Sequence, residues 1–472
     1  MGPAEQARIV LLTAGWCHWC SVFDAEVLRS PAVRAALHDS AQPLVADVDR
    51  QPAWLDLPGV TGLPTLALFD ADARLIGLRS GALPTETVLT MLRVPASGRA
   101  GHGGADDRGR LVSWPTWTLT ADEARRQLNV LEGELFIRVN DADGGFATPA
   151  RRPHPAALWA LVRWHAAGGP DRALRWVDLT LDSALRGESP RLVGRAPPLP
   201  ALTASALAAG SADLMAGGRG WPERAHPLST LDPFRGLRDP VEHGLYRYAE
   251  GPGWYHPHFE RLAADNLAWV AVARARGRAS DAIGIEYFVR DTLGRPDGSV
   301  AAHQRADPFY ARLTAAERRA VPRPAVTALC TTADQARAAR VWSHACTSLI
   351  DGFDGRWPGT AWRDTSRSPA PPDAVGELLL ALAGCPDGGP AARVLADVVV
   401  ARWQAGVLPG PWAAARLNPL VDGLCAASAE HCGPALAALE FVPFDLRYPP
   451  PLAALQTWIR RAEAPSEEAS DE

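Results

Sequence analysis

Two cysteines stand two residues apart in a Cys-His-Trp-Cys sequence that begins at Cys17 and ends at Cys20. An apolar run at 9–12 precedes them and a helical pattern follows, so we expect the pair at a strand-to-helix turn. The dipole and the free backbone N–H groups of a helix N-terminus favour a thiolate there. We therefore predict a dithiol/disulfide couple in which Cys17 is the nucleophile and Cys20 is the resolving thiol.

The same spacing also occurs in half of a four-thiolate zinc site. Such a site needs a second close pair, which the other cysteines do not offer, and we expect neither a metal nor another cofactor. The odd total of seven cysteines and their scatter argue against a disulfide-stapled scaffold and indicate a reducing, cytoplasmic environment. The cysteines outside the pair are Cys330, Cys346, Cys385, Cys425 and Cys432.

Two residues near the pair could tune its chemistry. His18, as an imidazolium, would stabilise the Cys17 thiolate, although it could equally be a solvent-facing residue. Asp24 lies one helical turn beyond Cys20 and could handle the proton of the resolving thiol, although a solvent-exposed helix acid is the alternative.

Other features resemble thioredoxin. They are Trp16 before the pair, Ala46-Asp47-Val48-Asp49, and Gly62-Leu63-Pro64-Thr65 before an apolar strand. The resemblance implies a cis Pro64 beside the dithiol, where the preceding backbone can pair with an extended substrate. The implied partner is therefore a protein thiol or disulfide. Leu11 stands where thioredoxin has a buried aspartate, which argues against a fast general reductase.

The elements that would position the dithiol lie in residues 1–94, which alternate between strand and helix patterns. We predict strands at 8–12, 44–49, 65–69 and 74–80 and helices at 21–37 and 85–93, with the first two strands parallel and the last two in a hairpin. Only about ten residues precede the first strand, so we interpret this unit as a trimmed thioredoxin-like domain. Residues 95–118 are rich in Gly and Ala without periodicity, which indicates a linker.

Helical patterns dominate the chain beyond residue 119. Helices in antiparallel pairs over this length predict an α/α toroid of about six hairpins at 119–462, with an α-solenoid as the alternative. The fold class is therefore α/β followed by all-α, and the acidic end at 463–472 is predicted to be disordered. The predicted helices span 121–139, 155–167, 171–186, 258–276, 281–293, 334–350, 374–383 and 393–404.

The composition, 47% hydrophobic and 21% charged, is that of a globular protein. A net charge of −5 gives no electrostatic reason to bind nucleic acid or an anionic membrane. No apolar run approaches the ~18 residues that span a bilayer. The polar start of the chain lacks a signal-peptide pattern, so we expect a cytoplasmic protein.

Several motifs recur in one family. They are the Cys-His-Trp-Cys sequence, Val48-Asp49-Arg50, Gly144-Gly145-Phe146, Pro153-His154-Pro155, Arg247-Tyr248, Trp254, Pro257-His258-Phe259-Glu260 and Asp265-Asn266. Both halves together thus resemble the thioredoxin-domain proteins related to spermatogenesis-associated protein, in which a short thioredoxin unit precedes an α/α toroid. The chain departs from that family at Ser21, Leu63 and Arg305, and little beyond Arg312 aligns.

The toroids most similar to the one implied handle sugars: epimerases of the N-acylglucosamine type and six-hairpin glycosidases. This resemblance implies a possible carbohydrate ligand near His258. We expect a helix from Pro257 that places His258, Arg261 and Asp265 on one face and turns Glu260 away. The candidate pocket comprises Arg247, Tyr248, Trp254, His258, Glu260, Arg261 and Asp265.

Epimerisation next to a carbonyl needs one group to remove a proton and another to return it. We assign His258 to one role and His303 or His344 to the other. The same residues also have structural interpretations: Asp265 could pair with Arg261 across a helical turn, and Trp254 could be a core aromatic.

The sequence therefore predicts a thiol–disulfide oxidoreductase whose toroid recognises a partner or ligand. A carbohydrate epimerase or isomerase in the toroid is the alternative, and a non-catalytic scaffold is the third possibility. The oxidoreductase hypothesis requires that the two sulfur atoms lie within bonding distance and that Cys17 is accessible from outside.

Overall fold

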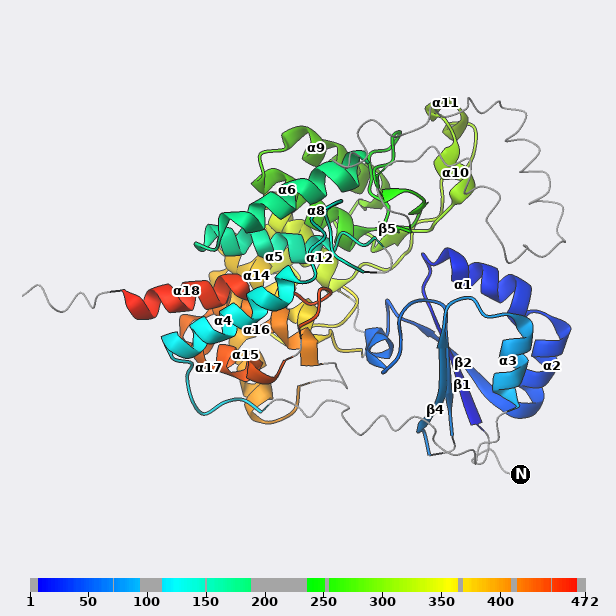
Figure 1. The fold of residues 1–472 in the computed structure, drawn as a ribbon, viewed down its shortest axis with the longest axis horizontal. Helices are drawn as coiled ribbons and strands as arrows, with labels where there is room; N and C mark the ends of the chain where they lie inside the picture. The colour runs from blue at the N-terminus through cyan, green and yellow to red at the C-terminus, as the bar shows by residue number, and fades with distance from the viewer. Residues whose placement is uncertain are drawn as a thin grey trace, which may run out of the picture.

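A small sheet with flanking helices and a larger ring of helices make up the protein, as the computed structural model shows (Figure 1). Residues 7–70, 72–93, 113–148, 151–187, 236–250, 254–363, 368–408, 414–442 and 444–464 are described. Most of the predicted linker and the predicted acidic tail lie outside these ranges. No helix in the described ranges is both long and apolar enough to cross a bilayer.

The sheet unit contains four strands in the order β2-β1-β3-β4. β1 and β2 are parallel, and β3 and β4 form an antiparallel hairpin, as predicted. β3 also runs antiparallel to β1. The helix expected at 21–37 instead begins at His18 and is interrupted before Pro31, a residue suited to a helix start. The elements are β1 (Ala7–Thr13), α1 (His18–Phe23), η1 (Asp24–Leu28), α2 (Pro31–Ser40), β2 (Ala41–Asp47), η2 (Pro52–Asp56), β3 (Thr65–Phe69), β4 (Leu75–Ser80) and α3 (Thr85–Leu92).

The two faces of this sheet have different neighbours, because successive side chains of a strand point to opposite sides. Ile9 of β1 packs with Phe23 and Val33 of the flanking helices. Val10, on the other face, belongs to a cluster that Leu262 of the helical part contacts. One face of the sheet unit is therefore directed toward the helical ring.

Twelve helices of the described ranges form two layers of a closed ring. Each inner helix packs on the next, and the last, α18, packs on both α16 and α5. The closure identifies an α/α toroid and excludes a solenoid. The inner helices are α5 (Pro155–Ala166), α8 (Ala263–Ala275), α12 (Thr332–Val341), α14 (Pro372–Gly384), α16 (Leu417–Ala427) and α18 (Leu452–Glu463); the outer helices are α4 (Ala121–Phe136), α6 (Asp171–Arg186), α9 (Ala279–Phe288), α13 (Ser343–Asp351), α15 (Gly389–Gln404) and α17 (Ala429–Ala437).

The segment before α8 departs from the predicted helix. Short strands form there because residues 257–258 and 261–262 pair with distant backbone, so the helix begins at Ala263. The helix expected at 334–350 is likewise two helices, separated at Trp342. The remaining elements are β5 (Tyr248–Ala249), β6 (Pro257–His258), β7 (Arg261–Leu262), η5 (Val289–Leu293), β8 (His303–Gln304), α10 (Pro308–Arg312), α11 (Ala315–Arg318), η6 (Ala414–Arg416) and η7 (Ala438–Phe441).

Disulfide bonds occur within the ring, contrary to the prediction of scattered, unpaired cysteines. Cys346 of α13 is bonded to Cys385 after α14, and Cys425 of α16 is bonded to Cys432 of α17. The prediction failed because Cys346 and Cys385, 39 residues apart, become neighbours when hairpins stack, and because Cys425 and Cys432 are brought together where α17 follows α16. Structural disulfides are typical of oxidising compartments, so cysteine usage no longer supports a cytoplasmic location.

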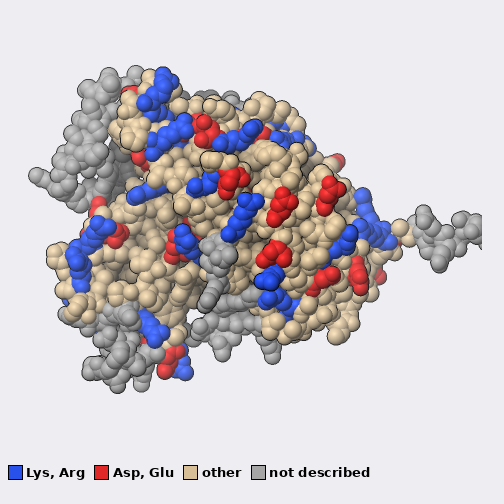
Figure 2. All heavy atoms as spheres, turned by 180° about the vertical axis from the view of Figure 1, so that it is seen from behind, with Lys and Arg blue, Asp and Glu red and all other residues tan. Residues whose placement is uncertain are grey.

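On the face drawn in Figure 2, acidic and basic side chains are interleaved.

Candidate functional site

The dithiol lies where the sequence predicted it, between β1 and α1. Cys17 and Cys20 are joined by a disulfide bond. Cys17 caps the N-terminus of α1, and its Sγ accepts a hydrogen bond from the Cys20 backbone N–H at 3.1 Å. The peptide bond before Pro64 is cis, as the resemblance to thioredoxin implied. The predicted arrangement of the two sulfur atoms is therefore confirmed.

The expected access to Cys17 from outside is wrong. Its relative exposure is 4%, because the helical ring covers this part of the sheet unit. The Arg247 guanidinium lies 4.2 Å from the centre of the Trp16 ring. The Ala306 N–H donates to the Trp16 carbonyl at 3.4 Å, and Leu262 packs against the cluster that contains both cysteines. A protein partner cannot reach Cys17 in this arrangement.

The residues expected to support the dithiol have other contacts. Asp24 accepts a hydrogen bond from Arg29 at 3.0 Å, and its side chain is 44% exposed, which matches the solvent-exposed alternative. His18 lies edge-on to the Trp19 ring, and its effect on a thiolate stays a prediction. The Trp16 indole N–H donates to Asp49 at 3.1 Å. No cluster of three potential metal ligands occurs in the described ranges.

Charged and aromatic side chains gather at the end of the ring that faces the sheet unit. We call Arg152, Arg247, Tyr248, Glu260 and Asp265 the mouth cluster. Arg247 forms a 3.7 Å ion pair with Glu260, so the prediction that Glu260 points away is wrong. The Arg152 guanidinium lies 4.9 Å from the centre of the Tyr248 ring. Burial raises the pKa of Tyr248 to about 12.

Asp265 differs from the other acids of this region. It lies in the first turn of α8, is half-buried, and forms no hydrogen bond or ion pair within the described ranges. Burial raises the pKa of its carboxyl, while the nearby Arg247, Arg337 and Arg152 oppose that rise. A carboxyl whose pKa is raised and whose oxygens have no partner among the described residues is suited to proton transfer.

His154 belongs to the same region, although the sequence analysis did not nominate it. It caps α5 with a left-handed backbone, φ 45°. Burial lowers its pKa to about 4, and Arg152 adds to the effect, so the imidazole is neutral at pH 7. The buried Nε2 has no hydrogen-bond partner among the described residues. In the sequence, the Pro-His-Pro turn at 153–155 is the feature that could have identified His154.

Three residues of the predicted pocket lie outside the mouth cluster. Trp254 is fully buried and donates to the Asp143 carbonyl at 2.8 Å, so it is a core aromatic. Arg261 is buried between Asp239, at 3.0 Å, and Glu242, at 2.6 Å. The expected face of His258, Arg261 and Asp265 is wrong, because α8 begins after two of them.

The histidines proposed to act together have separate partners. His258 stacks on Tyr248, with 3.9 Å between ring centres, and its Nε2 lies 2.7 Å from Glu250. His303 lies 3.3 Å from Asp49 of the sheet unit. His344 is exposed on the outer helix α13 and stacks on Trp342. None of these contacts brings two of the histidines together.

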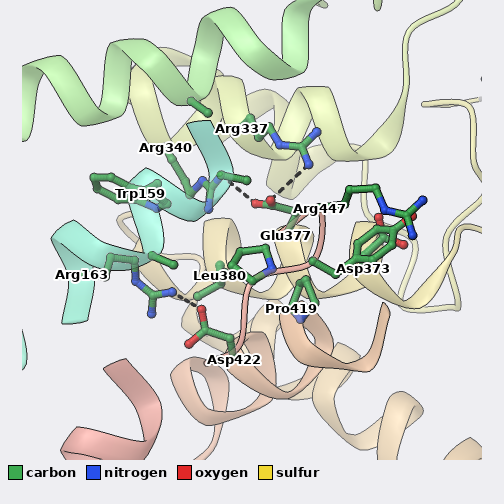
Figure 3. Close-up of a pocket in the computed structure, with 15 residues that line it drawn as sticks. Trp159, Arg163, Arg337, Arg340, Asp373, Glu377, Leu380, Pro419, Asp422 and Arg447 are labelled. Carbon is green, nitrogen blue, oxygen red and sulfur yellow. Dashed lines mark hydrogen bonds and ion pairs between the residues drawn. The ribbon is translucent and has the colours of Figure 1, made fainter. Parts of the chain in front are cut away.

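A small cavity of about 50 Å³ lies inside the ring (Figure 3). Glu377 of α14 binds Arg337 at 3.1 Å and Arg340 at 2.6 Å, both from α12. These two arginines lower the pKa of Glu377 although burial opposes them. Arg163 of α5 pairs with Asp422 of α16 across the same space. The cavity is therefore lined by fixed ion pairs.

The cavity and the mouth cluster are connected through two residues. Ala268 lines the cavity and lies three positions after Asp265, so both occupy one face of α8. Arg337 also lines the cavity, and its charge opposes the rise in the pKa of Asp265. The charge of a cavity residue thus acts on the Asp265 carboxyl of the mouth cluster.

The chain matches no protein-family model and no curated protein. Solved structures with a similar arrangement include a sugar epimerase from a ruminal bacterium (9% identity; 72% of this chain and 98% of that chain covered; TM-score 0.42). A cellobiose 2-epimerase from Bacillus thermoamylovorans is 8% identical, with 72% of this chain and 99% of that chain covered and a TM-score of 0.42. An unsaturated glucuronyl hydrolase specific for heparin is 12% identical, with 72% of this chain and 95% of that chain covered and a TM-score of 0.33.

Proposed function

We propose that the helical ring binds a small, carbohydrate-like molecule and acts on it by proton transfer, as an epimerase or isomerase does. The observation that carries this proposal is the Asp265 carboxyl, which has a raised pKa and no partner among the described residues. Removing a proton next to a carbonyl leaves negative charge on the carbonyl oxygen. Arg152 and Arg247, which both act electrostatically on Asp265, are suited to stabilise that charge.

His154 is the second proton-transfer group of the proposal. Epimerisation needs groups on two sides of the reacting carbon, and His154 and Asp265 begin two neighbouring inner helices, α5 and α8. Both interact electrostatically with Arg152. Tyr248, with a pKa of about 12, keeps its proton at pH 7 and can donate a hydrogen bond to a ligand oxygen.

The polar lining favours an enzyme over a scaffold. A ring that only presents a surface has no need for buried ion pairs such as Arg337–Glu377 and Arg163–Asp422, because apolar side chains fill a helical core at lower desolvation cost. Charged groups around a cavity, beside a carboxyl with a perturbed pKa, are typical of a ligand site.

Proton exchange with solvent tests this function. The protein is incubated with D-glucose, D-mannose, N-acetyl-D-glucosamine and cellobiose in deuterated water, and deuterium at the carbon next to the carbonyl is followed by proton NMR. We expect exchange with at least one sugar, and a loss of at least a hundredfold in Asp265→Asn. Asp24→Asn, which changes an exposed acid, is the matched control. Absence of exchange with all four sugars would refute the proposal.

A thiol–disulfide oxidoreductase in the sheet unit is the second candidate function. Its support is the placement of Cys17 at the N-terminus of α1, beside a sheet of order β2-β1-β3-β4, which fits the thioredoxin-like interpretation and the family resemblance. Exchange with a protein partner would require the sheet unit to move off the ring. Alkylation of the reduced parent and of Cys17→Ser at graded pH gives the thiol pKa, and a value at or above that of ordinary cysteine counts against this function.

A further inference from the structure

The ring holds both ends of the segment that carries the disulfide of the sheet unit, residues 16–21. At the start of the segment, the Trp16 carbonyl accepts a hydrogen bond from the Ala306 N–H at 3.4 Å. At its end, the Ser21 hydroxyl accepts a hydrogen bond from Arg305 at 2.8 Å. Two neighbouring residues of the ring thus bind on either side of the disulfide.

Leu262 of the ring adds an apolar contact at the same place. It directly precedes α8 and packs against a cluster of buried sheet-unit side chains that includes Cys17 and Cys20. The two cysteines are 4% and 5% exposed. We call Leu262, Arg305 and Ala306 the gate residues, and the bond between Cys17 and Cys20 the sheet-unit disulfide.

Reduction of the sheet-unit disulfide needs a thiolate that reaches one of its sulfur atoms. A dithiol reagent bonds through its first thiolate to Cys17, the bond between Cys17 and Cys20 breaks, and Cys20 leaves as a thiolate that takes up a proton. The second thiolate of the reagent displaces Cys17, which also takes up a proton, and closes the reagent's own disulfide. The reagent thus supplies two electrons, and its two thiol protons balance those taken up. Both attacks need open space beside Cys17, which the closed arrangement does not offer.

We propose that the ring is a gate over the sheet-unit disulfide, which reacts with a dithiol only while the gate residues are separated from the sheet unit. The inference goes beyond the proposed function and does not depend on it. An open form populated at about 0.1–10% is enough for reduction to proceed. Separation of the two parts of the chain is thereby converted into a change of redox state.

The contacts around the gate suit a form that opens rarely. The hydrogen bond of Arg305 to Ser21 lies at the surface, where water replaces it at little cost. Arg416 opposes the opening, because it binds Asp56 at 2.8 Å and the Pro52 carbonyl at 3.1 Å. We therefore expect an open form that is a minor population and in which neither part unfolds.

The disulfide between Cys346 and Cys385, the core disulfide, is an internal reference for this opening. Its cysteines belong to the hydrophobic core of the ring and are 5% and 7% exposed, so they are nearly as buried as Cys17 and Cys20. Unfolding of the ring exposes the core disulfide, whereas separation of the sheet unit leaves it covered. Faster reduction of the sheet-unit disulfide alone therefore reports the gate.

Reduction kinetics test the gate in the full-length protein. Dithiothreitol is added without denaturant, free thiols are alkylated at intervals, and mass spectrometry gives the reduced fraction of each disulfide. Leu262→Ala should accelerate reduction of the sheet-unit disulfide about tenfold, because part of an apolar contact is lost, and leave the core disulfide unchanged. Leu174→Ala, which shortens a partly buried leucine of α6 that packs against the ring core, is the matched control. It should leave the sheet-unit disulfide at the parent's rate.

Two further measurements apply if Leu262→Ala does not fold. Arg305→Ala removes a surface contact and should accelerate reduction of the sheet-unit disulfide about threefold, as the loss of one hydrogen bond does. In the parent, urea below the unfolding transition should accelerate reduction of the sheet-unit disulfide before that of the core disulfide, because separating two parts exposes less surface than unfolding.

Acceleration of the sheet-unit disulfide alone, by either gate substitution and by urea, supports the gate. An equal rate in the parent and both gate variants overturns it, and so does a rate in the folded parent that matches the rate in urea-unfolded protein. Equal rates for the two disulfides of the parent at every urea concentration also overturn it, because opening is then global. None of these results depends on deuterium exchange in the ring, so the gate and the proposed function fail separately.

Discussion

Arg416 donates a hydrogen bond through Nε to Asp56 across 2.8 Å, and this contact fastens the ring to the sheet unit. The same guanidinium donates to the Pro52 carbonyl at 3.1 Å and to Asp373 of α14 at 2.7 Å. The Arg416 and Asp56 side chains are only 3% and 4% exposed. One arginine thus connects η2 of the sheet unit to the inner helices, which keeps the sheet unit over the mouth.

Replacing Arg416 by methionine is expected to destabilise the protein by about 3–5 kcal/mol, because two buried carboxylates lose their counter-charge. Urea unfolding of parent and variant measures the change. Arg29→Ala is the control, since its ion pair with Asp24 is exposed and contributes at most about 1 kcal/mol. Equal effects of the two substitutions would show that Arg416 does not fasten the two parts.

The disulfide between Cys346 and Cys385 is expected to stabilise the ring more than the one between Cys425 and Cys432. The first closes a loop of 39 residues and the second a loop of seven. On the chain-entropy model these loops correspond to about 4 and about 2 kcal/mol.

Paired alanine substitutions at each bridge, followed by chemical unfolding without reductant, compare the two values. Mass spectrometry after alkylation of the non-reduced parent checks the pairing itself. Recovery of Cys346 and Cys385 as free thiols in fully folded protein would contradict the first bridge.

Trp16 is expected to influence Asp265 through Arg247. The Trp16 ring contacts the Arg247 guanidinium at 4.2 Å, and Arg247 is the leading charge that opposes the rise in the pKa of Asp265. Trp16→Leu should release Arg247 and raise the pKa of Asp265 further, moving the acid side of the deuterium-exchange profile to higher pH. Trp16→Phe, which keeps an aromatic face, should restore most of the parent profile.

Trp19→Leu is the control for this effect, because Trp19 is exposed and lies only three residues after Trp16, in α1. Carbon-13 NMR of the Asp265 carboxyl, assigned by its absence in Asp265→Asn, follows the same pKa without relying on turnover. An unchanged titration of Asp265 in Trp16→Leu would refute the coupling.

Local patterns predicted the elements whose boundaries depend on local chemistry. The helix at 171–186 was predicted with its observed bounds, because Pro170 precedes it and Gly187 ends it with φ 66°. The hairpin of β3 and β4 was likewise predicted, since its alternation and turn lie within one short segment. The pairing of Cys17 with Cys20 was also predicted, because both cysteines lie within one short segment.

Long-range contacts determined what the sequence could not predict. Residues 257–262 resemble a helix start, yet Arg261 is drawn to Asp239, 22 residues earlier, and the helix begins at Ala263. Cys17 belongs to a buried cluster against which Leu262 of the helical part packs, and no local pattern connects these two residues. Asp265 was nominated on a face that does not exist. The arginines whose charges act on it come from distant parts of the chain: Arg152 lies before α5, and Arg337 belongs to α12.

His154 is expected to make stability depend on pH below neutrality. Its folded pKa, about 4, lies below the unfolded value of 6.5, so the native state holds the neutral imidazole. The folding stability that comes from the neutral imidazole is fully present above pH 6.5. It is lost as the pH falls toward 4, because the unfolded chain then binds a proton that the native chain does not. The charges that act on His154 are those of Arg152, Asp445, Arg447 and Arg247.

Unfolding free energies at pH 7.5 and pH 5 test this expectation. Two-state linkage gives a loss of about 2 kcal/mol over that interval for the parent, and His154→Gln should remove this part of the pH dependence, whatever its own stability at pH 7.5. His165→Gln is the control, because His165 lies on the same helix, is partly exposed and pairs with Asp171. If His154→Gln loses as much stability as the parent on acidification, His154 is not held neutral in the folded protein, and its role as a proton acceptor at the mouth fails with it.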